Sequence, residues 1–182
     1  MRKIALVAGV IGASLVLAAC AGIPRPGPVG NAAVPQPAKA VVIRDYMGRW
    51  YEQFRYDASF QKDMEAVSAD YSLKPDGTVR VENSGRKNGV DGPLKTSIGK
   101  AKVVDTATNA KLKVSFFGPF YGDYWVLDHG DRYEWSIVGE PSGRYLWALT
   151  REAKPSAETL RMLRDRVRQM GYDESLIRIT RH

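Results

Sequence analysis

Cysteine and histidine are scarce in this chain of 182 residues, which contains one Cys and two His. A single Cys excludes an intrachain disulfide framework and a metal site built from several thiolates. Two His exclude every site that needs three imidazole ligands. The sequence also lacks a Gly-x-Ser-x-Gly motif, a phosphate loop and a His-Glu-x-x-His motif. We therefore expect no metal, no cofactor and no enzymatic activity, although an isomerase or hydrolase stays a minor alternative.

Acidic residues are absent from the first 40 positions, whereas 4 of the 27 basic residues lie there. The remaining chain carries 23 basic and 20 acidic residues, so much of the formal net charge of +7 belongs to the leading segment. What is left is only mildly basic. It gives no reason to expect a nucleic-acid partner, because such proteins concentrate Lys and Arg on one face.

The first twenty residues have the layout of a secretory signal. Arg2 and Lys3 precede an uncharged run over residues 4–19. Its length suits the apolar core of a signal peptide and is marginal for a membrane-spanning helix, which needs about 20 apolar residues. The run ends in Leu17-Ala18-Ala19-Cys20, which resembles the bacterial lipobox, where the Cys is acylated and becomes the new N-terminus.

This resemblance implies a signal peptide over residues 1–19 and a membrane anchor on Cys20. Ala21 rather than Asp follows the Cys, which in such lipoproteins implies sorting to the outer membrane, here facing the periplasm. An uncleaved membrane anchor with an incidental Cys is the alternative. Residues 21–40 contain half of the chain's 10 prolines and no apolar periodicity. We expect residues 20–40 to be the acylated Cys and a tether without packed contacts.

The folded domain, over residues 41–182, is predicted to be all-β with one helix. Apolar residues alternate with polar ones over 67–73 and 79–82, and Pro75-Asp76-Gly77 between them indicates a hairpin. The same alternation and further turn signals give eight strands between residue 48 and residue 150. A single antiparallel meander of this size removes its open edges by closing into a barrel. Apolar residues at helical spacing over 160–170 predict one C-terminal helix packed outside.

Gly48-Arg49-Trp50 opens this meander, and Leu146-Trp147-Ala148-Leu149-Thr150-Arg151 ends it before the helix. This order resembles the lipocalins, an up-and-down barrel family. The family pattern implies that Trp50 plugs the closed end, that Gly48 precedes the plug and that Arg151 stacks over it. Phe116-Phe117-Gly118-Pro119-Phe120-Tyr121-Gly122 and the lipobox are similar to sequences of bacterial outer-membrane lipocalins and their apolipoprotein D-like relatives.

A barrel of eight strands has room for a side-chain core or one small ligand. The inward face, assigned by alternation from Trp50, includes Glu52, which is either a polar anchor in the pocket or a structural partner of an Arg. The face of the seventh strand, near Trp135, stays open. The expected ligand-binding residues are Phe54, Tyr56, Ala69, Tyr71, Leu112, Val114, Phe116, Tyr124, Val126, Tyr145 and Trp147.

Chain direction places four loops at the open end, where aromatic residues accompany cations. The expected mouth cations are Arg86, Lys87, Lys95 and Arg144. Such a rim suits a long-chain ligand with an anionic head, a fatty acid or lysophospholipid, and equally suits a contact with a membrane or in a homodimer. The sequence therefore predicts a membrane-anchored lipocalin that stores or transports a small hydrophobic ligand. The alternative is an envelope lipoprotein that scaffolds other proteins.

Overall fold

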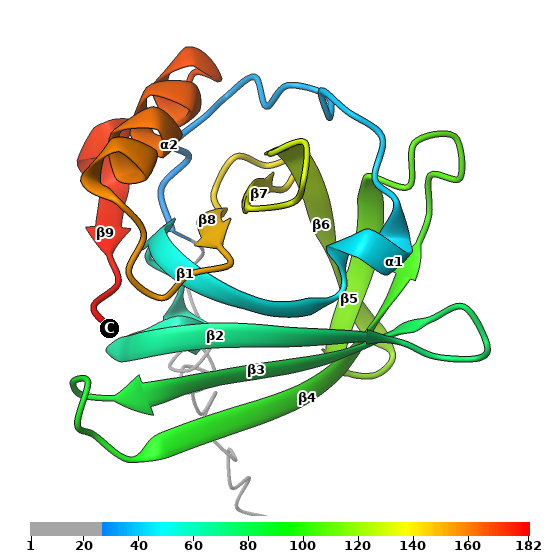
Figure 1. Cartoon of the computed structure of the whole chain (residues 1–182), viewed down its shortest axis with the longest axis horizontal. Helices are drawn as coiled ribbons and strands as arrows, with labels where there is room; N and C mark the ends of the chain where they lie inside the picture. Colours follow the sequence, from blue (N-terminus) through cyan, green and yellow to red (C-terminus); the bar gives the residue numbers. More distant parts are fainter. Residues whose placement is uncertain (1–26) are drawn as a thin grey trace, which may run out of the picture.

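The computed structural model describes residues 27–182, which form a barrel of antiparallel strands with a helix on its outside (Figure 1). The elements in chain order are α1 (Ile43–Tyr46), β1 (Gly48–Tyr56), η1 (Ser59–Gln61), β2 (Met64–Leu73), β3 (Val79–Lys87), β4 (Leu94–Val103), β5 (Lys111–Phe117), β6 (Phe120–His129), β7 (Trp135–Gly139), β8 (Leu146–Thr150), α2 (Ala157–Gln169), η2 (Glu174–Leu176) and β9 (Ile177–Ile179).

Each of the first eight strands pairs with its neighbour in the chain, and β1 pairs with both β2 and β8. This double pairing closes the sheet and removes its edges, so the predicted eight-stranded up-and-down barrel is confirmed. β1 separates from β2 after Tyr51, and β9 takes the vacated edge by pairing with Phe54–Tyr56. The C-terminal residues thus complete the wall where two barrel strands diverge.

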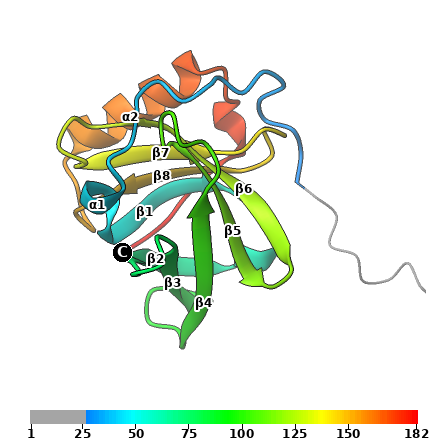
Figure 2. The same cartoon turned by 90° about the vertical axis from the view of Figure 1, so that its right-hand side faces the viewer.

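The barrel has two different ends (Figure 2). We call the end that carries α1 and the β6–β7 connection the floor. The mouth is the end that carries the β1–β2, β3–β4, β5–β6 and β7–β8 connections. Because consecutive strands are antiparallel, every second connection lies at the same end, which confirms the predicted placement of the loops.

Side chains in β1 change face at a bulge. Trp50 belongs to the interior cluster, and Glu52 lies opposite the interior residue Leu149. The register then shifts between Glu52 and Phe54, and a bulge of this kind reverses the alternation. Phe54 and Tyr56 consequently point outward and pack under α2. The prediction that these two residues line the pocket is therefore wrong.

A second apolar cluster lies between the barrel wall and α2. Leu163 and Val167 of the helix are fully buried there, against Trp135 and Ile137 of β7. This settles the face of β7: Trp135 and Ile137 point outward, and Ser136 and Val138 point inward.

Both ends of α2 are set by capping residues in its sequence. The Ser156 side chain accepts a hydrogen bond from the Thr159 backbone N–H, which is an ordinary N-cap. Gly171 follows the C-cap with φ of +86°, a conformation that favours glycine. Among residues 27–182, no helix combines the length and the apolar character needed to cross a bilayer.

Residues 27–40 pack along the outside of the barrel from mouth to floor. The Gly30 N–H donates to the Gly143 carbonyl at 2.9 Å, and the Ala38 N–H donates to the Leu127 carbonyl at 2.8 Å. Asn31 is 5% exposed and donates from Nδ2 to the Met170 carbonyl at the end of α2. The expectation of a tether without packed contacts is therefore wrong for this segment. Backbone hydrogen bonds, which apolar periodicity does not report, hold it in place.

The predicted signal peptide over 1–19, the predicted acylation site Cys20 and residues 21–26 lie outside the described residues.

Candidate functional site

The barrel contains a small apolar cavity of about 70 Å³ on the side of β2 to β6. Its lining residues are Ile43, Tyr46, Met47, Tyr71, Val79, Val81, Asn83, Ala101, Leu112, Val114, Phe116 and Tyr124. Pockets for drug-sized ligands measure about 300–1,000 Å³. The cavity therefore accepts only part of such a molecule unless side chains move.

Five of the predicted pocket residues line this cavity: Tyr71, Leu112, Val114, Phe116 and Tyr124. Ala69 and Val126 are buried in the same interior cluster without lining it. Tyr145 and Trp147 stack on each other with ring centroids 5.8 Å apart, and Phe60 of η1 packs against Tyr145. These rings come from β8, its preceding connection and the β1–β2 connection, so they lie on the mouth side.

Sequence reasoning missed two groups of cavity residues. Val79, Val81 and Asn83 alternate along β3. Their period of two was visible, but no inward face was assigned to that strand. Ile43, Tyr46 and Met47 come from α1 and the residue after it, which fold under the barrel. A single helical turn has no recognisable sequence period, so nothing in the sequence indicated that these residues cover the floor side of the cavity.

Three tyrosine hydroxyls form a chain inside the barrel. The Tyr124 hydroxyl lies 3.1 Å from those of both Tyr71 and Tyr46, and the Tyr46 hydroxyl lies 2.9 Å from the Ser136 Oγ. Burial raises the pKa of Tyr46 to about 12 and raises the pKa values of Tyr71 and Tyr124 well above 10. All three rings therefore keep their protons at neutral pH and offer dipoles, not charge, to a ligand.

Asn83 adds a polar atom to the cavity wall. Its Oδ1 is buried and has no hydrogen-bond partner among residues 27–182. Buried polar side chains are nearly always satisfied in folded proteins. A ligand group that donates a hydrogen bond would satisfy this oxygen, so the cavity can hold a weakly polar group among apolar walls.

The floor is sealed by Trp50 and Arg151. Trp50 is fully buried, and the Arg151 guanidinium carbon lies 3.7 Å from the centre of its ring, so the predicted stacking contact is present. Arg151 also donates to the backbone carbonyls of Tyr133 at 3.1 Å and Arg49 at 2.8 Å. Gly48 has φ of +92° beside this guanidinium, where glycine is favoured.

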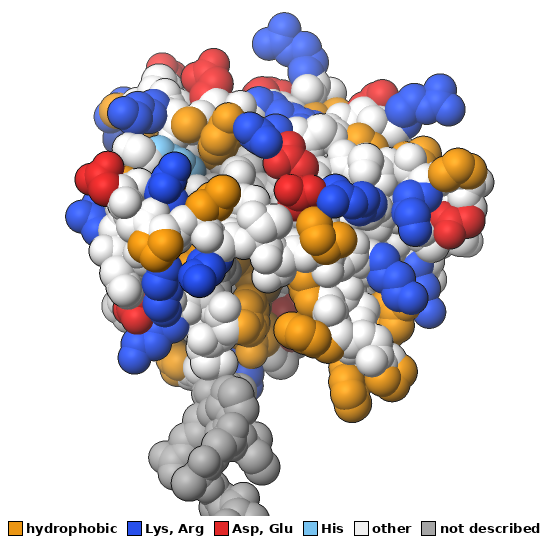
Figure 3. Space-filling model, turned by 90° about the horizontal axis from the view of Figure 1, so that it is seen from below, with side chains coloured by type: hydrophobic (Ala, Val, Ile, Leu, Met, Phe, Trp, Pro, Cys, Tyr) orange, Lys and Arg blue, Asp and Glu red, His pale blue; other side chains and the backbone are white. Residues whose placement is uncertain are grey.

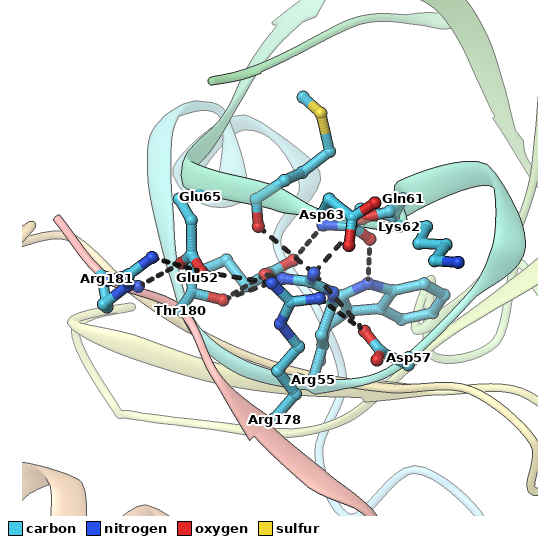
Figure 4. A network of polar contacts seen from close by, with 12 residues as sticks. Glu52, Arg55, Asp57, Gln61, Lys62, Asp63, Glu65, Arg178, Thr180 and Arg181 are labelled. Carbon is cyan, nitrogen blue, oxygen red and sulfur yellow. Dashed lines mark hydrogen bonds and ion pairs between the residues drawn. The ribbon is translucent and has the colours of Figure 1, made fainter. Parts of the chain in front are cut away.

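A buried ion pair lies further along β1 (Figure 4). Arg55 donates to Glu52 Oε1 at 2.6 Å, and Gln61 of η1 donates to Glu52 Oε2 at 2.5 Å. Thr180, which follows β9, donates to the same carboxylate. Of the two predicted roles for Glu52, the structure supports the structural partner of an Arg.

The same network ties down the β1–β2 connection. Arg55 is fully buried and donates to the carbonyls of Gln61 and Met64, each at 3.2 Å. Trp147, on the interior face of β8, donates from Nε1 to Gln61 Oε1 at 3.1 Å. Removal of one charge from this pair would leave the other buried without a partner, which is costly.

The predicted mouth cations divide into two groups. Arg86 and Lys87 end β3 and donate to the carbonyls of Gly92 and Lys62, at 2.9 and 2.7 Å. Lys95 lies beside them in β4 and has no ion-pair partner within the described part of the chain. Arg144 lies apart, in the β7–β8 connection, where it donates to the Gly27 carbonyl.

A larger hollow of about 420 Å³ lies outside the barrel near the start of α2. Glu134, Arg151, Glu152 and Glu158 are among its lining residues, so its wall is charged and unsuited to an apolar ligand. In the part of the chain that the structure describes, no three His, Cys, Asp or Glu side chains are grouped to hold a metal ion.

The closed barrel, its Trp–Arg floor and its internal cavity define a lipocalin. Residues 41–182 match the lipocalin-like domain model, and the chain belongs to the lipocalin family. It is similar to the outer membrane lipoprotein Blc of Escherichia coli K12, with 38% identity over 181 residues that cover 96% of this chain and 94% of that protein.

Other relatives extend the family beyond bacteria. Apolipoprotein D of Mus musculus is 31% identical over 140 residues, which cover 72% of this chain and 71% of that protein. Among solved structures, insecticyanin from the tobacco hornworm Manduca sexta aligns with a TM-score of 0.65 and 18% identity, covering 88% of this chain and 89% of that one. That likeness supports the fold alone.

Proposed function

We propose that this protein is an outer-membrane lipocalin, anchored through Cys20, that binds a small hydrophobic ligand inside its barrel and stores or transports it within the cell envelope. The apolar cavity enclosed by β2 to β6 and α1 carries this proposal. The lipobox-like Leu17-Ala18-Ala19-Cys20 supports the anchor. The names of relatives such as the outer membrane lipoprotein Blc support the location.

The ligand that we propose is a single-chain amphiphile, a fatty acid or a lysophospholipid. Its chain would enter among Phe116, Tyr124 and Trp147, and its head would stay near Lys95 at the mouth. A cavity of about 70 Å³ is too small for a whole chain, so binding requires movement of side chains in its wall, such as the half-buried Phe116.

A scaffold without a ligand is the second candidate, and the small volume of the cavity favours it. The two differ in how affinity depends on chain length. Each methylene that enters an apolar site contributes about 0.8 kcal/mol. Affinity for a filled cavity therefore rises steeply with chain length and then stops rising.

The test is a titration of delipidated protein with fatty acids of increasing length. Affinity should rise with each added methylene in the wild type. Ala101→Phe, which fills the cavity wall, should move the optimum to shorter chains. Lys102→Phe is the matched control, because Lys102 is the next residue of β4 and is exposed. Equal affinity for all lengths, with both variants folded, would favour the scaffold.

A further inference from the structure

The described chain begins at the mouth of the barrel. The Arg144 guanidinium, in the β7–β8 connection, donates to the Gly27 carbonyl. Three residues later, the Gly30 N–H donates to the Gly143 carbonyl of the same connection. From there the segment runs along the outer wall to α1 at the floor (Figure 2). Any anchor that precedes residue 27 therefore holds the protein by its mouth.

The reach of that anchor is short. Cys20 precedes Gly27 by seven residues, and seven extended residues span at most about 25 Å. This limit comes from the covalent chain and needs no particular conformation. An acyl chain on Cys20 would thus keep the mouth within about 25 Å of the bilayer surface.

The mouth exposes the side chains that such a surface would accept. The three most exposed large apolar side chains in residues 27–182 are Phe117, Phe120 and Phe60, with exposed fractions of 81%, 78% and 70%. All three lie in or beside mouth connections. Hydrophobic side chains gather around a hollow in the surface on this side (Figure 3). Phe side chains on the apolar face of an interfacial segment are buried at the boundary between lipid headgroups and acyl chains.

The floor differs from the mouth in the kind and exposure of its apolar side chains. Its exposed large apolar residues are Leu73 at the end of β2, Val104 just after β4 and Val42 just before α1, with exposed fractions of 43%, 47% and 56%. None is aromatic. Lys95 lies at the mouth with the Phe residues, whereas Lys87 is already paired with Asp63 at 3.5 Å. A cation near an anionic bilayer contributes about 1 kcal/mol. The exposed aromatic rings therefore distinguish the mouth from the floor, and Lys95 adds to the attraction of the mouth for an anionic bilayer.

We propose that the mouth of the barrel docks on the bilayer that anchors the chain, with Phe117 and Phe120 in the headgroup region. A lipid could then pass between the bilayer and the cavity without crossing water. This inference rests on the membrane anchor of the proposed function and is independent of which ligand the cavity holds.

The test measures the orientation of the full acylated protein in vesicles of phosphatidylethanolamine and phosphatidylglycerol. Cys20 is the chain's only Cys and is blocked by its acyl groups, so one added Cys accepts a fluorophore selectively. Lys62→Cys places the label at the mouth, and Thr106→Cys places it at the floor; both positions are exposed. Spin-labelled lipids should quench the mouth label at least twofold more strongly than the floor label.

Substitutions identify the side chains that hold the mouth at the bilayer. Phe117→Ser with Phe120→Ser should reduce quenching of the mouth label, whereas the matched floor pair Leu73→Ser with Val104→Ser should leave it unchanged. Equal quenching at both positions, or stronger quenching at the floor, would overturn the proposal. Energy transfer between mouth labels of two copies without lipid quenching would also overturn it, because a second copy would then cover this surface.

A fatty-acid titration on the same samples separates this proposal from the ligand. Mouth-specific quenching without fatty-acid binding would support docking and contradict the proposed ligand. Fatty-acid binding without mouth-specific quenching would support the proposed ligand and contradict docking.

Discussion

The floor and the mouth of the barrel contain the same kinds of side chain in opposite situations. At the floor, Trp50 is fully buried and Arg151 donates to several backbone carbonyls. At the mouth, Phe117 and Phe120 are largely exposed. Lys95 has no ion-pair partner within the described chain.

This difference separates stability from binding. Groups at the floor have their partners already, so their substitution should reduce the free energy of unfolding. Phe117, Phe120 and Lys95 at the mouth gain partners only when another molecule binds there, so their substitution should change binding and leave stability nearly unchanged. Each prediction below can sharpen or break that division.

The largest effect is expected at the floor plug. Trp50→Ala removes a fully buried ring and the surface on which Arg151 stacks. We expect it to lower the free energy of unfolding by about 3–5 kcal/mol. Phe120→Ala, the mouth counterpart, should change it by less than about 0.5 kcal/mol. Urea denaturation measures both, and similar losses would contradict the division between the two ends.

The ion pair under the β1–β2 connection should come next. Glu52→Ala leaves the fully buried Arg55 without its carboxylate, and breaking a buried pair in this way costs about 3 kcal/mol or more. Asp70→Ala is the control, because Asp70 pairs with Arg49 at 2.9 Å on the surface. An exposed pair of this kind contributes at most about 1 kcal/mol. Equal losses would mean that water reaches Glu52.

The third prediction concerns alkaline pH and the tyrosine chain. Burial raises the pKa values of Tyr46, Tyr71 and Tyr124 in the folded protein, so the unfolded chain releases these protons first. The contribution of these three groups to stability should therefore be constant below about pH 10 and fall as the pH rises toward 12, by up to about 1.4 kcal/mol per pH unit for each group.

Tyr71→Phe tests this directly. The variant removes one of the titrating groups, so its stability should fall less steeply with pH, although it loses a hydrogen bond to Tyr124. Urea denaturation at a series of pH values between 8 and 11.5 measures the slope. An unchanged slope would mean that other groups control the alkaline transition.

Residue patterns predicted the barrel because alternation and turns are local. Apolar side chains alternate along one strand at Val67, Ala69, Tyr71 and Leu73. Trp50 in the first strand and Arg151 just after the eighth have the order typical of lipocalins. These signals needed no knowledge of packing. The same holds for α2, whose Ser156 cap and Gly171 end are short sequence features.

The errors come from features that depend on distant contacts. The bulge in β1 moves Phe54 and Tyr56 to the outer face, and no turn residue marks it. Residues 27–40 pack through hydrogen bonds to Gly143, Leu127 and Met170. Those partners lie about 90 residues or more away in the chain, so proline content alone wrongly indicated a free tether.

The smallest effect is expected at the mouth cations. A ligand head at Lys95 stays in water, so this cation should contribute only about 0.2–1 kcal/mol to binding, as in exposed ion pairs. Lys95→Ala should therefore weaken fatty-acid affinity by less than about fivefold. Arg132→Ala, at an exposed cation of the floor, should leave it unchanged. Fluorescence titration at low and high salt measures both.

A matching titration with fatty alcohols tells which end of the ligand enters first. If the carboxylate lies at the mouth, Lys95→Ala should weaken the affinity for the acid and leave the affinity for the alcohol unchanged. Added salt should have the same effect. If the polar end instead enters the cavity, it meets Asn83 Oδ1 and the neutral tyrosine hydroxyls. The alcohol would then bind more tightly than the acid, because a buried carboxylate has no cation there to offset its desolvation. That outcome would contradict the head position proposed here. It would mean that the ligand is recognised toward the floor of the barrel, at the same end as the groups that determine stability.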